Sequence, residues 1–113
     1  MPYINQVEIS GNVAKVGIST TSSGAKAAYF DVAIDSGPGY DPAFMMTNTV
    51  WIRVNCYNKV AEIVEKNLEK GDYVIVFGRL MSRKLKTGDC VVVEVKAKRV
   101  EIIKKQHRIK VSQ

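Results

Sequence analysis

Apolar and polar residues alternate along most of the chain, and a period of two is typical of β-strands with one buried face. Turn-forming residues separate the alternating stretches, as at Thr20 to Gly24 and Lys86 to Asp89. The pattern therefore predicts five strands, over residues 3–13 with a continuation over 16–20, and over 29–34, 48–56, 73–84 and 90–103.

The period changes once, between the third and fourth predicted strands. Val60, Val64 and Leu68 are spaced four residues apart, which predicts one amphipathic helix. Asn58 is expected to cap the start of this helix and Gly71 to end it. Residues 35–48 contain several glycines and prolines, so they are expected to form a long loop.

The order of these elements indicates the fold class. Three strands, one helix and two strands make an all-β domain with a single helix. A five-stranded Greek-key barrel with its helix between strands 3 and 4 is an OB-fold, a barrel used to bind oligonucleotides and oligosaccharides. The order favours this fold, with other small α+β folds as the alternative. Gly78 inside the fourth strand indicates a bend or bulge of this barrel. The domain is expected to span residues 1–103, followed by a short basic tail over 104–113.

Charge is distributed unevenly within a net value of +6. Residues 1–57 hold three basic and four acidic residues, whereas residues 58–113 hold fourteen basic and seven acidic ones. Such asymmetry favours a polyanionic partner, with an anionic membrane surface as the weaker alternative. No stretch of about 18 apolar residues predicts a membrane span. The start of the chain does not match a secretory signal, so a cytoplasmic, nucleoid-associated location is expected.

The third predicted strand carries candidate binding chemistry. Ile52, Val54 and Cys56 share one face and form the expected core set. Aromatic rings with cations between them suit single-stranded nucleic acid, because bases stack on the rings while cations contact phosphates. The alternative is that the aromatic residues of this strand cover a second core or a subunit interface. The opposite face carries a tryptophan, a guanidinium, an amide and a phenol, namely Trp51, Arg53, Asn55 and Tyr57.

The fourth and fifth strands extend this candidate surface. Val74, Val76, Gly78 and Leu80 are expected to point inward, as are Val93, Val95 and Ala97 on the fifth strand, whereas Glu94 is expected to look outward. For the basic residues of this surface, the alternative is a hairpin whose charges are simply solvated. For Ile75 and Phe77, the alternative is a contact between subunits. Tyr40 is a candidate to close over bound bases, with a loop that tucks its apolar residues under itself as the equal alternative. The further candidate contacts are Phe77, Arg79, Arg83, Lys84, Lys86, Lys96 and Lys98.

The sequence argues against catalysis. Cys56 and Cys90 fit no metal-ligand spacing and are expected to be free thiols. The acidic residues are scattered, and the single histidine, His107, lies in the tail. Neither a metal-dependent nuclease site nor a Ser-His-Asp set can be assembled from this pattern. We therefore expect no catalytic residue, metal, cofactor or small-molecule substrate.

Seven segments of the chain carry a resemblance to a known family. They are Ile4 to Asn12, Ala28 to Ala33, Trp51 to Val54, Lys59 to Glu62, Leu68 to Gly71, Gly78 to Lys84 and Val91 to Val95. In these segments the chain resembles the bacterial single-stranded DNA-binding protein family, and the likeness covers about residues 3–103. No single motif decides it, but the order and spacing of all of them do.

The resemblance implies an OB-fold, binding of single-stranded DNA without sequence preference in replication, recombination or repair, assembly into a homo-oligomer (a tetramer or a dimer), and no catalysis. Base-stacking positions of the family match Trp51 and Tyr57. Leu85 replaces a further family aromatic, and Tyr40 approximates another, so stacking is expected to be weaker and charge more important.

The C-terminus departs from the family pattern. Cellular members end in a long segment with an acidic, aromatic tip that recruits other proteins, whereas the last ten residues of this sequence include Lys104, Lys105, Arg108 and Lys110. The resemblance therefore implies a short form: a phage, plasmid or accessory paralogue, a primosomal replication protein N-like protein, or a longer protein trimmed after the barrel. Two other functions stay open. One is a replisome accessory subunit acting through protein contacts, and the other is RNA binding by the same barrel.

Overall fold

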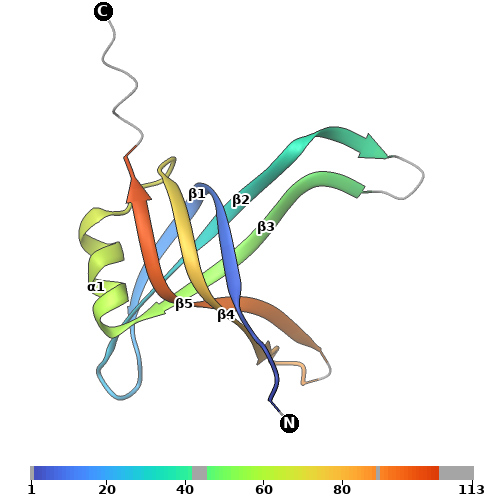
Figure 1. The fold of residues 1–113 in the computed structure, drawn as a ribbon. Coiled ribbons are helices and arrows are strands. Elements are labelled where there is room, and N and C mark those ends of the chain that lie inside the picture. Colours follow the sequence, from blue (N-terminus) through green and yellow to red (C-terminus); the bar gives the residue numbers. More distant parts are fainter. Residues whose placement is uncertain (1, 42–45, 89, 105–113) are drawn as a thin grey trace, which may run out of the picture.

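Five strands close into a barrel in the order β1-β2-β3-β5-β4 (Figure 1). The structure is a computed structural model that describes residues 2–41, 46–88 and 90–104, with the backbone alone for residues 36–41, 46 and 47. All neighbouring strands are antiparallel except β3 and β5, which run parallel. The elements are β1 (Val7–Thr20), β2 (Lys26–Asp41), β3 (Met46–Tyr57), α1 (Asn58–Asn67), β4 (Tyr73–Lys84) and β5 (Val91–Ile103).

The core confirms the alternation predicted for the central strands. Phe30 and Val32 of β2, Val54 and Cys56 of β3, and Val74 and Val76 of β4 are all fully buried. Their polar neighbours point away from the barrel axis, as the pleat of a strand requires. The predicted fold class, an all-β barrel of the OB type with one helix between strands 3 and 4, is confirmed.

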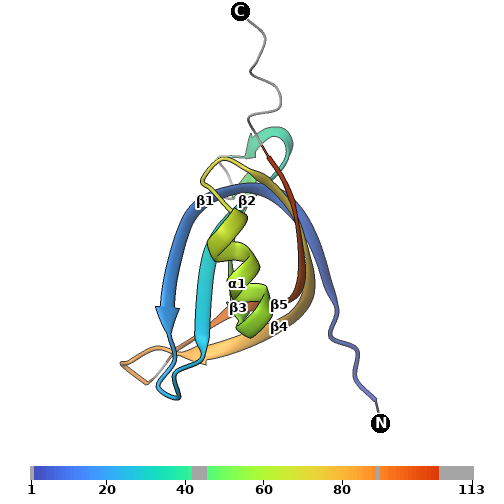
Figure 2. The same ribbon diagram turned by 90° about the vertical axis from the view of Figure 1, so that its left-hand side faces the viewer.

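Helix α1 covers one end of the barrel, and in Figure 2, seen from that side, it lies in front of the strands. Ala61, Val64 and Leu68 bury its apolar face against the core, as the spacing predicted. The predicted cap is wrong, because Tyr57 occupies the N-cap position without a side-chain hydrogen bond. Asn58 instead adopts a left-handed φ of 56°, a conformation that asparagine tolerates better than most residues.

The segment between α1 and β4 is fastened to its surroundings. Gly71, at a φ of 96°, donates its backbone N–H to the carbonyl oxygen of Val13 at 2.8 Å. The buried carboxylate of Asp72 accepts the backbone N–H of Glu69 at 2.9 Å and the Lys104 ammonium at 2.7 Å. Lys104, the first residue of the predicted tail, is thus bonded to the barrel, and residues 105–113 lie outside the described residues.

The predicted loop over residues 35–48 is wrong for most of its length. Strands β2 and β3 continue as a hairpin that projects from the barrel (Figure 1), and only residues 42–45 lie outside the description. The register shifts between Asp35 and Tyr40, so Pro38 lies where the ladder is interrupted. A proline, which cannot donate to a ladder, is tolerated at such an irregularity.

Three further expectations need correction. Strand β1 begins at Val7, and Tyr3 and Ile4 before it are 92% and 87% exposed. Leu80 and Val93, expected in the core, are exposed because the β4–β5 hairpin extends beyond the barrel wall. Glu94 lies on the outer face with Asn55 and Arg83, as expected, but these side chains bond to it and it is only 6% exposed.

Gly78 marks a close approach between β4 and β5. The register of this pair shifts between Phe77 and Gly78, which leaves Lys98 of β5 without a partner and confirms the predicted bulge. A Cβ atom at residue 78 would lie 2.0 Å from the Lys96 carbonyl oxygen. The backbones of β4 and β5 are therefore closer here than a residue with a Cβ atom at position 78 would allow.

Gly78→Ala should destabilise the barrel by about 1–3 kcal/mol, because the added methyl group forces two backbones apart. Urea unfolding followed by circular dichroism measures the loss. Ser82→Ala, an exposed change on the same strand, is the control and should shift stability by less than about 0.5 kcal/mol. Equal stability of the two variants would contradict the close approach.

Candidate nucleic-acid interface

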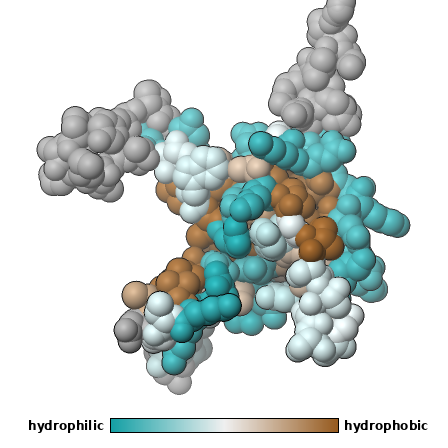
Figure 3. All heavy atoms as spheres, turned by 180° about the vertical axis from the view of Figure 1, so that it is seen from behind, coloured by the Kyte–Doolittle hydropathy of each residue, from teal (hydrophilic) through white to brown (hydrophobic). Residues whose placement is uncertain are grey.

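The outer surface of the barrel mixes polar and apolar side chains. Figure 3 shows the face opposite to that of Figure 1. Hydrophilic side chains lie between hydrophobic ones over the barrel. Hydrophobic surface also appears where the β4–β5 hairpin and the N-terminal segment project. Large exposed apolar residues include Trp51, Val50, Val91 and Val93. The chemistry of the surface therefore depends on individual side chains and their partners.

The outer face of β3 presents its aromatic residues as expected. Trp51 is 62% exposed, because its cross-strand neighbour on β2 is the small Ala33. Tyr57, at the end of the same strand, is half-buried. An indole exposed to this extent on a rigid strand offers a flat face to a ligand.

Arg53, between the two aromatic residues, is already engaged. Its Nε donates to Asp31 Oδ1 at 2.9 Å and its Nη2 to Asp31 Oδ2 at 3.3 Å. Its guanidinium also lies 4.3 Å from the centre of the Tyr29 ring. The Asp31 hydrogen bond holds the pKa of Arg53 above its ordinary value. This cation is therefore fixed in place, with its charge largely balanced by Asp31.

A second ion pair connects β3, β4 and β5. The buried Glu94 carboxylate accepts Asn55 Nδ2 at 2.8 Å and Arg83 Nη2 at 2.8 Å. Asn55 Nδ2 also lies 3.9 Å from the Met81 sulfur. The Arg83 hydrogen bond, helped by the Asn55 amide, lowers the pKa of Glu94 in spite of its burial. Glu94 is therefore an anion that holds Asn55 and Arg83 together.

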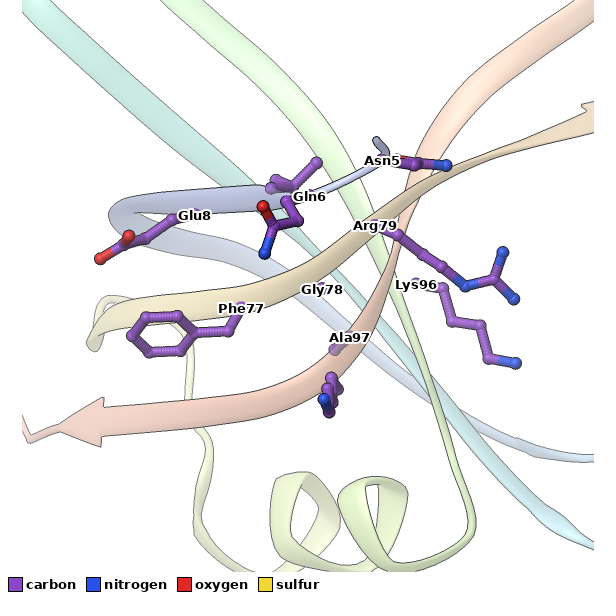
Figure 4. Close-up of a pocket in the computed structure, with 10 residues that line it drawn as sticks. Asn5, Gln6, Glu8, Phe77, Gly78, Arg79, Lys96 and Ala97 are labelled. Carbon is purple, nitrogen blue, oxygen red and sulfur yellow. The ribbon is translucent and has the colours of Figure 1, made fainter. Parts of the chain in front are cut away.

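A groove runs over the outer face of β4 and β5 and contains most of the other candidates. Its larger part, about 740 Å³, is lined by Phe77, Arg79, Lys96 and Lys98 together with residues 5–8 (Figure 4). A smaller part of about 400 Å³ lies against the β1–β2 turn and is lined by Tyr57, Arg79 and Lys96. The two parts share Arg79 and Lys96, so these two cations lie between them.

Two aromatic rings of this groove have cationic neighbours. The Lys96 ammonium lies 5.5 Å from the centre of the Tyr57 ring, and the Arg99 guanidinium lies 4.2 Å from that of Phe77. Arg99 also bonds to Glu101 at 2.6 Å. Cation–π contacts of this kind hold a charge beside a ring without neutralising it.

The remaining candidates lie apart from this assembly. Lys84 and Lys86 are exposed at the tip of the β4–β5 hairpin. Tyr40 pairs with Thr47 in the projecting part of β2, and its side chain lies outside the description. Sequence reasoning missed the contacts made by Tyr29, Asp31, Glu94 and Arg99. Only the strand register, which no local pattern predicts, brings these residues to their partners.

The described residues contain neither a candidate metal site nor a candidate membrane-spanning helix. Within residues 2–41, 46–88 and 90–104, no three His, Cys, Asp or Glu side chains gather as metal ligands. None of the helices in this part of the chain is long and apolar enough to cross a membrane. Cys56 and Cys90 are free thiols, as predicted, and burial raises the pKa of Cys56 to about 12.

A closed five-stranded barrel with a helix between strands 3 and 4 and a cationic groove beside exposed aromatics defines an OB-fold of the nucleic-acid-binding type. Residues 4–109 match the Single-strand binding protein family, so the chain belongs to this family. It is also similar to "Single-stranded DNA-binding protein 2" of Chlorobaculum tepidum, with 34% identity over 119 aligned positions. That alignment covers 96% of this chain and 76% of the relative.

Glu94→Gln should destabilise the fold by about 1–3 kcal/mol at neutral pH, because Arg83 and Asn55 lose their charged acceptor. The pKa of Glu94 is lower in the folded than in the unfolded chain, so its contribution is complete above the ordinary value of 4.5 and is lost as the pH falls through the folded value. Urea unfolding of both proteins at neutral pH and at about pH 3 measures this. A stability difference that does not shrink in acid would contradict the assignment.

Proposed function

We propose that the protein binds single-stranded DNA without sequence preference and covers it during replication, recombination or repair, and that it acts by binding rather than by catalysis. The carrying observation is the 62% exposed Trp51 on a strand adjacent to the groove that contains Arg79 and Lys96. Bases stack on exposed aromatic faces whatever their identity, while cations follow the backbone. Membership of the Single-strand binding protein family supports the same function.

The proposed interface comprises the predicted residues of β3, β4 and β5. Trp51 and Tyr57 serve as stacking positions, with Phe77 as a third ring in the groove. Arg53, Asn55 and Arg83 are held by Asp31 and Glu94, so they form a rigid surface for bases. The cations proposed to contact phosphates are Arg79, Lys84, Lys86, Lys96 and Lys98, and Tyr40 is proposed to extend the surface along the β2–β3 hairpin.

We further propose that copies of the chain assemble with one another and act in the cytoplasm on nucleoid DNA. Exposed apolar side chains outside the groove support self-association, among them Tyr3, Ile4, Ile18 and Ile103. Exposed apolar side chains of this kind can be buried at an interface between copies. Light scattering should give the mass of a tetramer or a dimer, four or two times the 12.6 kDa of one chain, and a monomer at micromolar concentration would contradict this proposal.

Titration with oligo-dT, with oligo-rU and with a DNA duplex of equal length tests the proposed function. Trp51 is the only tryptophan, so intrinsic fluorescence reports on one proposed stacking position. Strong quenching by oligo-dT and little by the duplex is the expected outcome. Tighter binding of oligo-rU would favour RNA as the partner. No binding of any oligonucleotide would favour a protein-interaction module.

Trp51→Ala should weaken oligo-dT binding by about 5- to 150-fold, which corresponds to one lost stack of about 1–3 kcal/mol. Fluorescence anisotropy of a labelled oligonucleotide measures this without the tryptophan signal. Trp51→Phe keeps an aromatic face and should retain most of the affinity. If Trp51→Ala binds as tightly as the unchanged protein, the outer face of β3 does not carry the DNA.

A further inference from the structure

Two cations face each other across strands β4 and β5. Arg79 and Lys96 are direct register partners, and both side chains extend from the sheet in the same direction (Figure 4). Like charges directly opposite each other destabilise an antiparallel pair, and a sheet normally places an acidic or neutral residue at one of the two positions. This position of the sheet is therefore electrostatically unfavourable in the free protein.

The neighbouring arginines do not share this arrangement. Arg83 is paired with Glu94, Arg53 with Asp31 and Arg99 with Glu101. Within the described part of the chain, no carboxylate forms an ion pair with either Arg79 or Lys96, and Lys98 in the same groove is likewise without one. Arg79 and Lys96 differ from Lys98 in that they face each other directly across the two strands.

The shape of the surface gives this pair access to a ligand. Both parts of the groove are lined by Arg79 and Lys96, so the two cations lie between them. Lys96 is also held near the Tyr57 ring. An anion between the two cations would be adjacent to a face on which a base can stack.

We propose that Arg79 and Lys96 form the principal phosphate site of the groove, where one or two backbone phosphates replace the missing counter-charge. This inference rests on the proposed function and refines it. Arg53 and Arg83, whose charges Asp31 and Glu94 balance, orient the strand but release few counterions. The salt dependence of binding therefore arises mainly from the unpaired cations.

The double variant Arg79→Gln/Lys96→Gln tests the site. Each phosphate neutralised on a single strand contributes about 0.7 to the slope of log affinity against log salt. The variant should therefore lower the slope for oligo-dT by about 0.7 to 1.4 and weaken binding up to about tenfold near 0.2 M salt. Without DNA it should unfold at a higher temperature than the unchanged protein, because the repulsion is removed.

Lys66→Gln/Lys70→Gln removes the same charge from exposed positions at the end of α1 and is the matched control. Its slope should equal that of the unchanged protein, and Arg79→Lys should also keep the slope. If the unchanged protein binds oligo-dT and the Arg79/Lys96 variant has the same slope, the phosphate site is wrong while the proposed function stands. An equal fall in the control also overturns the site. If the unchanged protein binds no oligo-dT, both proposals fail.

Discussion

The parallel pairing of β3 with β5 is the contact on which the barrel and its outer surface depend. It comprises two register pairs, Val54 with Val95 and Asn55 with Lys96. The first pair is buried and joins the core of the two strands, whereas the second points outward. Because only two residue pairs join these strands, side chains must help to close the barrel. The hydrogen bond from Asn55 of β3 to Glu94 of β5 is one such contact beside the backbone ladder.

Closure of the barrel also brings together aromatic and cationic side chains that are distant in the sequence. Strand β3 carries Trp51 and Tyr57, whereas β4 and β5 carry Arg79 and Lys96, and only the closed barrel places Tyr57 near Lys96. The close approach at Gly78 and the unpaired Lys98 bend β4 and β5 across the barrel, and the groove lies along this bend. The same constraint that completes the core thus forms the candidate interface.

The charges of this surface fall into two groups with different physical roles. Carboxylates hold Arg53 and Arg83 in fixed positions, and a held guanidinium loses little conformational freedom when a ligand arrives. Arg79 and Lys96 have no such partner among the described residues, so an incoming anion meets uncompensated positive potential. The net charge favours a polyanionic partner, but it does not distinguish the cations that carboxylates balance from those that they leave unbalanced.

The sequence by itself determined the order of the elements, the buried faces of β2 and β3 and the apolar face of α1, because each depends on a periodicity that neighbouring residues express locally. Its prediction failed where the backbone pairs beyond the barrel, as in the β2–β3 hairpin and at Leu80 and Val93. Only the tertiary structure decided that Glu94 is buried, that Asp31 balances Arg53 and that Arg79 faces Lys96. These relations follow from the register between strands far apart in the chain, and local patterns do not encode that register.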